Sequence, residues 1–481
     1  LALTATSIGM TPADPLFNTP PEMNIFGPLG NFRLFGNSGN DFTTANKYLS
    51  AADNFSWVHG KHNIRTGMFL MRLSNARLDT GTARGKMSFQ TFSDFLLGLD
   101  AADNLSPLGR SNVQSIQANE GVGPVGEVQY GYLSHYGAGF VQDDFKILPR
   151  LTLNLGLRWE YVGAASDTFG TIGNVLPSLL LKNPIPPASG TLVGNTVAAN
   201  YNASLINPYT GKAFGAPPTG VTVQPNNSFY QNSTPLDTFA PRFGFAWQPF
   251  GKEGFLAVRG GYGWFYQPPT YSANASGIPM FTAPPFAQGF TNADTSNNLS
   301  TFQQPYPATT LGYVPRTLTS QLSDRVAGPD FVIPRLQQWN LSTQFRLAKS
   351  LTFDIGYVGT HASRLLLSRG LNQPVLASVS SPVNCGYDGV ATDCITTNTS
   401  KNAKYRVPVL GETPTALGDN EFTGASTYNS LQATLRRQSH GLAFQATYTY
   451  SRASSNTTTY NDLTNMALNW ARTSFDRTHR L

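Results

Sequence analysis

Apolar and polar side chains alternate strictly along several stretches of the chain. In the clearest stretch, 151–161, the odd positions hold Leu151, Leu153, Leu155, Leu157, Trp159 and Tyr161, and the even positions hold polar residues and one glycine. Successive side chains of a β-strand point to opposite faces, so this pattern predicts a strand with one apolar face. Its length matches the about 9–11 residues that a strand needs to cross a membrane.

The same pattern recurs along the chain. It is clear in 242–247, 341–347, 351–357, 431–436 and 442–451, and weaker in 62–73, 132–145 and 255–266. With shorter candidates included, the sequence predicts roughly a dozen strands and an all-β fold.

The predicted strands are joined by connections of two kinds. Short connections at 146–150, 248–254, 348–350 and 438–441 alternate with long, irregular stretches at about 162–238, 267–334 and 360–425. Long structureless loops count against a compact soluble domain. Short turns alternating with long loops are typical of an outer-membrane barrel, whose periplasmic turns are short and extracellular loops long.

A membrane explains the two-faced strands. Lipid offers no hydrogen-bond partners, so a membrane sheet must be closed and antiparallel, with one face toward acyl chains and the other toward a lumen. We therefore expect the six odd-numbered residues from Leu151 to Tyr161 to face lipid. The residues expected to face the lumen are Arg158, Glu160, Arg346, Asp354 and Arg436. A soluble sandwich or propeller is the alternative, but it does not explain the asymmetry of the connections.

Composition agrees with this interpretation. Charged residues make up 12% of the 481 residues, about half of the usual share of soluble domains. Mean hydropathy is −0.21, and no apolar run is long enough for a transmembrane helix. The formal charge is +6, yet no Lys/Arg run is present, so we expect no nucleic-acid partner.

The two cysteines are expected to form a disulfide. Cys385 and Cys394 lie in a stretch rich in Asn, Ser, Thr and Gly. A loop disulfide in an oxidising envelope is favoured over free thiols. A zinc site would need further ligands, and none lie nearby in the sequence.

Other motifs do not predict chemistry. Gly121–Gly126 satisfies G-x-G-x-x-G but contains Pro124 and opens no helix, and 81–87 resembles a P-loop but is one residue short. We interpret the latter as a loop before a strand at 86–89. His59 and His62 flank a probable hairpin turn without a third ligand, and Asp143 and Asp144, as neighbours on a strand, face opposite ways. We expect no enzyme activity and no cofactor.

Several blocks resemble a known family. Phe140–Tyr161 resembles a hairpin of TonB-dependent receptors, as do Asn54–Gly67, Ala240–Trp247 and Val258–Tyr266. The stretches similar to the Oar-like receptors of acidobacteria are Gln338–Ser342, Gly356–Thr360, Tyr428–Gln432, Tyr448–Ser451 and Ser474–Arg477. The resemblance implies a 22-stranded barrel with an N-terminal plug, energised by an inner-membrane complex.

The chain departs from that plan because no plug, no TonB box and no final aromatic strand are recognisable. We therefore expect residues 1–481 to be a partial barrel without the plug and the C-terminal strands. The leading hypothesis is energised uptake of a large or scarce substrate, a saccharide or peptide by loop composition, across the cell outer membrane. Its partners would be outer-membrane lipid, an unknown substrate and a TonB-type complex reached through the missing N-terminal region. The alternatives are a non-transporting surface or adhesion barrel and a secreted glycan-binding β protein.

Overall fold

The structure of the chain is a computed structural model. It describes residues 3–12, 18–28, 30–35, 42–79, 84–121, 129–170, 172–186, 191–206, 212–228, 230–232, 234–250, 255–267, 287–292, 300–305, 316–318, 325–414, 417–439, 441–457 and 465–481. None of the helices in this part of the chain has both the length and the apolar character that crossing a membrane requires.

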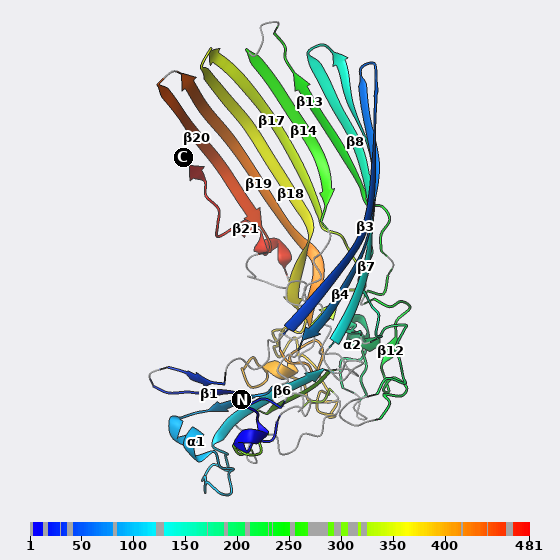
Figure 1. The fold of residues 1–481 in the computed structure, drawn as a ribbon. Helices are drawn as coiled ribbons and strands as arrows, with labels where there is room; N and C mark the ends of the chain where they lie inside the picture. Colours follow the sequence, from blue (N-terminus) through cyan, green and yellow to red (C-terminus); the bar gives the residue numbers. More distant parts are fainter. Residues whose placement is uncertain are drawn as a thin grey trace.

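Ten long strands dominate the described structure. They follow one another across the main sheet in chain order, each antiparallel to the next (Figure 1). They are β3 (Phe42–His59), β4 (His62–Asp79), β7 (Gln129–Leu148), β8 (Leu151–Val162), β13 (Phe239–Trp247), β14 (Leu256–Tyr266), β17 (Arg335–Ala348), β18 (Leu351–Gly370), β19 (Gly418–Ser439) and β20 (Leu442–Ser455). The all-β, antiparallel architecture predicted from the sequence is confirmed.

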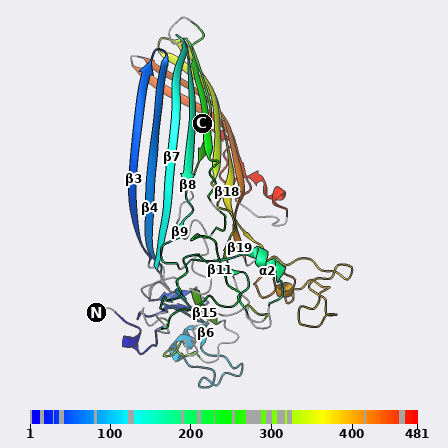
Figure 2. The same ribbon diagram turned by 90° about the vertical axis from the view of Figure 1, so that its right-hand side faces the viewer.

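The sheet is curved but does not close on itself. β3 is its last strand on one side, and it does not pair with β20 near the other side. Among the described residues, two short segments lie beyond β20, namely β21 (Ala471–Arg472) and β22 (His479–Arg480). The described strands therefore form an open wall (Figures 1 and 2).

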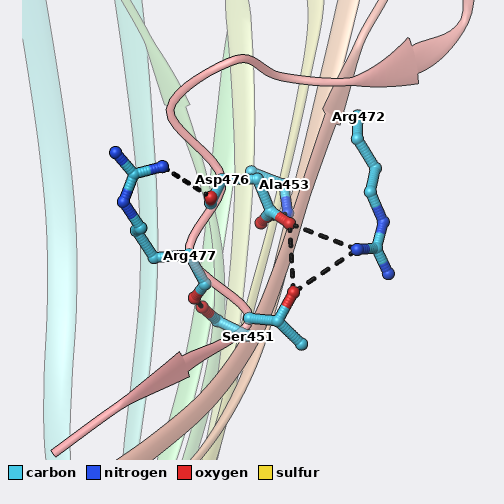
Figure 3. A network of polar contacts seen from close by, with 6 residues as sticks. Ser451, Ala453, Arg472, Asp476 and Arg477 are labelled. Carbon is cyan, nitrogen blue, oxygen red and sulfur yellow. Dashed lines mark hydrogen bonds and ion pairs between the residues drawn. The ribbon is translucent and has the colours of Figure 1, made fainter.

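Hydrogen bonds that involve side chains connect the segment between β21 and β22 to β20. The backbone N–H of Ala453 donates to Asp476 Oδ1 at 2.7 Å, and Ser451 Oγ donates to the carbonyl of Arg477 at 2.9 Å. Arg472 lies 3.7 Å from the other Asp476 oxygen (Figure 3). The Asp476 carboxylate thus accepts the hydrogen bond that a backbone carbonyl would accept in a regular strand.

The short connections lie together at one end of the sheet, the short-turn end. Residues 60–61, 149–150 and 349–350 each link two strands directly. Gly60 has φ +57° and Gly441, in the turn before β20, has φ +82°, a backbone conformation that glycine adopts without steric cost. These connections lie where the sequence predicted them.

The strands are longer than predicted toward the opposite, long-loop end. β4 continues to Asp79 and β7 begins at Gln129, and the expected loop 360–425 shrinks to 371–417 because β18 runs to Gly370 and β19 begins at Gly418. Those loop bounds were wrong for a physical reason. Alternation is imposed only where one face meets lipid, and strand pairing continues in water without it.

The segments at the long-loop end form a folded layer. One sheet has the order β15 (Ala287–Asn292), β6 (Val113–Gly121), β5 (Lys86–Phe89), β1 (Glu22–Ile25), β2 (Phe32–Leu34), and a second contains β10 (Gly173–Val175), β11 (Asn195–Val197) and β12 (Thr222–Val223). Short helices α1 (Phe92–Leu97) and α2 (Pro177–Lys182), 3₁₀ turns at Thr6–Ile8, Ala403–Tyr405 and Met466–Asn469, and strands β9 (Ser166–Asp167) and β16 (Arg325–Ala327) complete the elements.

The hydrophobic core lies in this layer and includes residues of the long strands only near their long-loop ends, such as Tyr132 of β7 and Val162 of β8. One cluster includes Met23, Met87, Phe89 and Ile116, all at most 1% exposed, and α1 packs on it through Phe95. Two further clusters centre on Phe331 and on Leu180. The long-loop layer can therefore hold its own shape, while the sheet beside it keeps its apolar side chains at the surface.

Candidate functional site on the polar face of the sheet

The two faces of the sheet differ in chemistry. Residues directly opposite each other on paired strands share a face. The registers from β8 through β13, β14, β17 and β18 to β19 place all the residues expected in the lumen on one side, here the polar face: Arg158, Glu160, Arg346, Asp354 and Arg436. The odd-numbered residues from Leu151 to Tyr161 lie on the other side, the apolar face.

The apolar face is exposed along its length. Leu155 and Leu157 are each 44% exposed, and Phe243, Leu341 and Leu431 on other strands are 44–52% exposed. In a sandwich a second sheet would bury these side chains. None of the six predicted residues on β8 is buried, so a stacked-sheet arrangement does not fit, and contact with lipid stays our prediction for this face.

An ion pair with a buried carboxylate lies on the polar face of β8. Arg158 Nε donates to Glu160 Oε1 at 2.6 Å, and the Tyr136 hydroxyl donates to Glu160 Oε2 at 3.0 Å. The hydroxyl also accepts from Arg158 Nη2 at 3.1 Å. Glu160 is 5% exposed, so the partners replace the water that its charge would otherwise need. The sequence indicated Arg158 and Glu160, but nothing in the alternation pointed to Tyr136 on the neighbouring strand.

A second polar group lies nearer the short-turn end. Asp144 forms an ion pair with Arg65 and accepts from Asn154 Nδ2 at 2.6 Å. Its neighbour Asp143 points to the other face, where Nδ1 of His62 lies 2.7 Å from its carboxylate. The two aspartates therefore do not converge, as predicted, and the partner of the His62 side chain is Asp143.

Between these groups the polar face is hollowed. A cavity of about 240 Å³ is lined by Phe140, Val141, Gln142, Gly156, Leu157, Arg158 and Arg242. The Arg242 guanidinium lies over the Phe265 ring, 4.4 Å from its centroid. Two guanidinium groups and an amide can hold a carboxylate or another small anionic group.

The described residues contain no cluster of three His, Cys, Asp or Glu that could hold a metal ion. The G-x-G-x-x-G motif falls mostly on 122–126, outside the described residues, as do 81–83 of the P-loop-like stretch. Lys86 and Met87 of that stretch belong to β5. The polar face thus offers ion pairs and hydrogen-bonding groups.

A disulfide fastens the loop between β18 and β19. Cys385 and Cys394 are joined, with their Cα atoms 4.0 Å apart. Val383 and Ile395 bridge the same two segments through their backbones. The side chain of Asn384 donates to the carbonyls of Tyr405 and Val407. The disulfide, the backbone bridge and the Asn384 hydrogen bonds therefore stabilise the conformation of this loop.

Where β18 and β19 enter the long-loop layer, three charged groups meet. Arg369 forms a bidentate pair with Glu421 at 2.8 and 3.0 Å, and Asp419 lies directly opposite Arg369. Burial, and after it the Glu421 charge, raise the pKa of Asp419 to about 6 against the opposing effect of Arg369. Sequence reasoning missed this group because its members are brought together only by the register of the two strands.

A family model described as "Outer membrane beta barrel domain" matches residues 2–481. The chain is also similar to solved structures. These include the copper transporter OprC (9% identity, 86% of this chain and 39% of that chain covered, TM-score 0.38). They also include the siderophore receptor PirA from Pseudomonas aeruginosa (11%, 88% and 47%, TM-score 0.34).

The ferripyoverdine receptor of the P. aeruginosa outer membrane gives a similar result (8% identity, 91% of this chain and 35% of that chain covered, TM-score 0.37). The chain thus spans 35–47% of the length of these three structures. No curated protein matches the chain.

Proposed function

Because the chain belongs to the outer membrane beta barrel domain family, we propose that it forms part of the wall of a TonB-dependent receptor-type transporter. It lies in the cell outer membrane. Further strands would complete the barrel, a plug would occupy its lumen, and a TonB-type complex would supply the energy. The finer Oar-like assignment belongs to this proposal.

The observation that carries the proposal is the polar face. Ten long strands curve without closing, and their common polar side holds cross-strand ion pairs and an arginine-lined hollow. Small barrels of about eight strands fill their interior with side chains, while barrels of about 16 to 22 strands enclose a channel or a plug. A wall this wide, with charged groups on one face, suits a large polar lumen.

The long-loop layer supports a receptor role. Long loops of such barrels are extracellular, and here they fold into small sheets with their own core. A preformed surface binds a ligand with less loss of conformational entropy than a flexible loop does. We infer a capture surface for a large or scarce substrate, with saccharides and peptides as the first classes to test.

Uptake by intact cells tests the proposal. Accumulation of labelled oligosaccharides, peptides, ferric siderophores and copper would be compared in a deletion strain, in the complemented strain and in the complemented strain treated with a proton uncoupler. We expect at least one compound to require both the gene and the proton gradient. If no compound does, or if the uptake that depends on the gene persists without the gradient, the transporter proposal is wrong.

One observation favours the alternative of a non-transporting surface barrel. Around α1, apolar side chains are strongly exposed, with Leu96 at 68%, Leu105 at 84% and Leu108 at 73%, and exposed apolar patches commonly contact partners. Adhesion of the deletion strain to surfaces and other cells discriminates the two functions. A secreted soluble protein is not proposed, since the family is one of the outer membrane.

A further inference from the structure

The apolar face changes character at a constant height. Toward the long-loop end it carries basic side chains, here the cation band: Lys47, Arg72, His135, Arg335, His361 and Arg452. Arg72 is directly opposite both Leu49 and His135, and Lys47 lies two residues from Leu49 on the same face of β3. Three neighbouring strands, β3, β4 and β7, therefore bring three basic groups together.

The height of the band matches the edge of the hydrocarbon layer. Each member lies ten to thirteen residues from the short-turn end of its strand; Arg72 follows His62 by ten and Lys47 precedes His59 by twelve. A strand rises about 3.3 Å per residue and tilts by about 40°, so ten to thirteen residues climb about 25 to 33 Å, which is at or just above the about 25 Å height of the apolar belt of an outer-membrane barrel. Exposed Leu70, Val141 and Leu157 lie below that height.

The band has few internal partners. Lys47, Arg72 and Arg452 are exposed and have no ion pair among the described residues. Arg335 lies over the Trp264 ring, 4.4 Å from its centroid, an arrangement suited to the membrane interface. On β3, β4 and β7 the carboxylate nearest to this height on the same face, Asp53, lies six residues from the end of β3, closer to the short turn. Beside β20, Asp476 lies next to Arg452 and is paired with Arg472.

We propose that the cation band binds the phosphate groups of lipids in the outer leaflet, with Lys47, Arg72 and His135 as one site. Guanidinium and ammonium groups bind phosphate through charge-assisted hydrogen bonds. Groups opposite each other on paired strands are about 5 Å apart, so one headgroup can engage several of them. The proposal rests on the outer-membrane location and the two-faced sheet, and it is independent of transport.

Binding of a phosphorylated lipid tests the proposal. The full-length protein, purified from outer membranes in mild detergent, would be titrated with diphosphorylated lipid A, and bound lipid counted by native mass spectrometry. We expect K47Q/R72Q to weaken binding at least about tenfold, since both substitutions remove a cation that attracts the anionic headgroup. Raising NaCl from about 0.05 M to about 0.5 M should weaken wild-type binding in the same direction.

Matched controls separate the site from general charge. K182Q/K401Q removes the same charge from exposed positions of the long-loop layer and should bind like wild type, as should the charge-preserving K47R/R72K. If K47Q/R72Q does not show the gel-mobility shift of a folded barrel, R335Q/R452Q tests the other part of the band instead. The proposal is overturned by equal affinity of wild type for dephosphorylated lipid A, by unchanged binding in the folded band variants, or by stronger competition from soluble polyphosphate than from lipid.

Discussion

Removing the Glu160 carboxylate should show how much unfolding free energy is lost when the charge of Arg158 has no carboxylate partner. In Glu160→Ala, Arg158 loses its ion pair at 2.6 Å and keeps only the Tyr136 hydroxyl. The Arg158 side chain is 25% exposed, so water compensates it in part. Breaking a buried pair costs about 3–5 kcal/mol, and the partial exposure points to the lower end, about 3 kcal/mol of unfolding free energy.

Replacing both charges should cost far less. Arg158→Met with Glu160→Leu keeps the volume and leaves no unpaired charge, so we expect a loss within about 1 kcal/mol of wild type. Asp354→Ala is the matched control, because Asp354 lies on the same face and no described group is bonded to its carboxylate. We expect it to cost less than about 1 kcal/mol.

Urea unfolding of the protein folded into phospholipid vesicles, followed by tryptophan fluorescence, measures these differences. The double-mutant cycle then isolates the coupling between the two side chains. The reasoning is refuted if Glu160→Ala costs no more than Asp354→Ala, or if the double variant is as unstable as the single one.

Three further outcomes can be checked. Cys385→Ser breaks the disulfide and should make the loop 371–417 more sensitive to protease, because the closed ring stabilises the loop by about 3 kcal/mol of chain entropy. The unfolding midpoint of the sheet should stay unchanged, and an unaltered cleavage rate would contradict this. Because the Asp419 pKa is raised to about 6, its contribution to stability is full below about pH 4 and is lost as the pH rises through 6; about 1 to 2 kcal/mol is at stake after solvent screening. Hydrogen exchange near Gly418, corrected for intrinsic rates, should show this decline, and Asp419→Asn should abolish it. Gly359→Ala places a Cβ 2.2 Å from the Trp339 ring and should cost about 1–3 kcal/mol in urea unfolding, whereas Gly139→Ala meets nothing closer than 3.9 Å; equal costs would refute the packing argument.

The sequence alone determined the features that repeat locally. Alternation is a property of each strand, so 151–161 identified β8 and both its faces, and Lys86–Phe89 was found although it is only four residues long. The short connections were equally predictable from the sequence, since a tight turn leaves a polar or glycine-containing break between two alternating stretches. One physical cause, lipid on one side and polar groups on the other, imposes the pattern.

Tertiary structure decided what depends on partners distant in the chain. Tyr136 reaches Glu160, and Asp419 meets Arg369, only because strand registers bring them together. Apart from Lys86–Phe89, the long-loop layer gave no periodic signal, because its short strands take their stability from a core assembled out of several segments. The strand ends in water could likewise not be predicted from the sequence, since strand pairing there satisfies the backbone hydrogen-bonding groups without constraining which side chains are apolar.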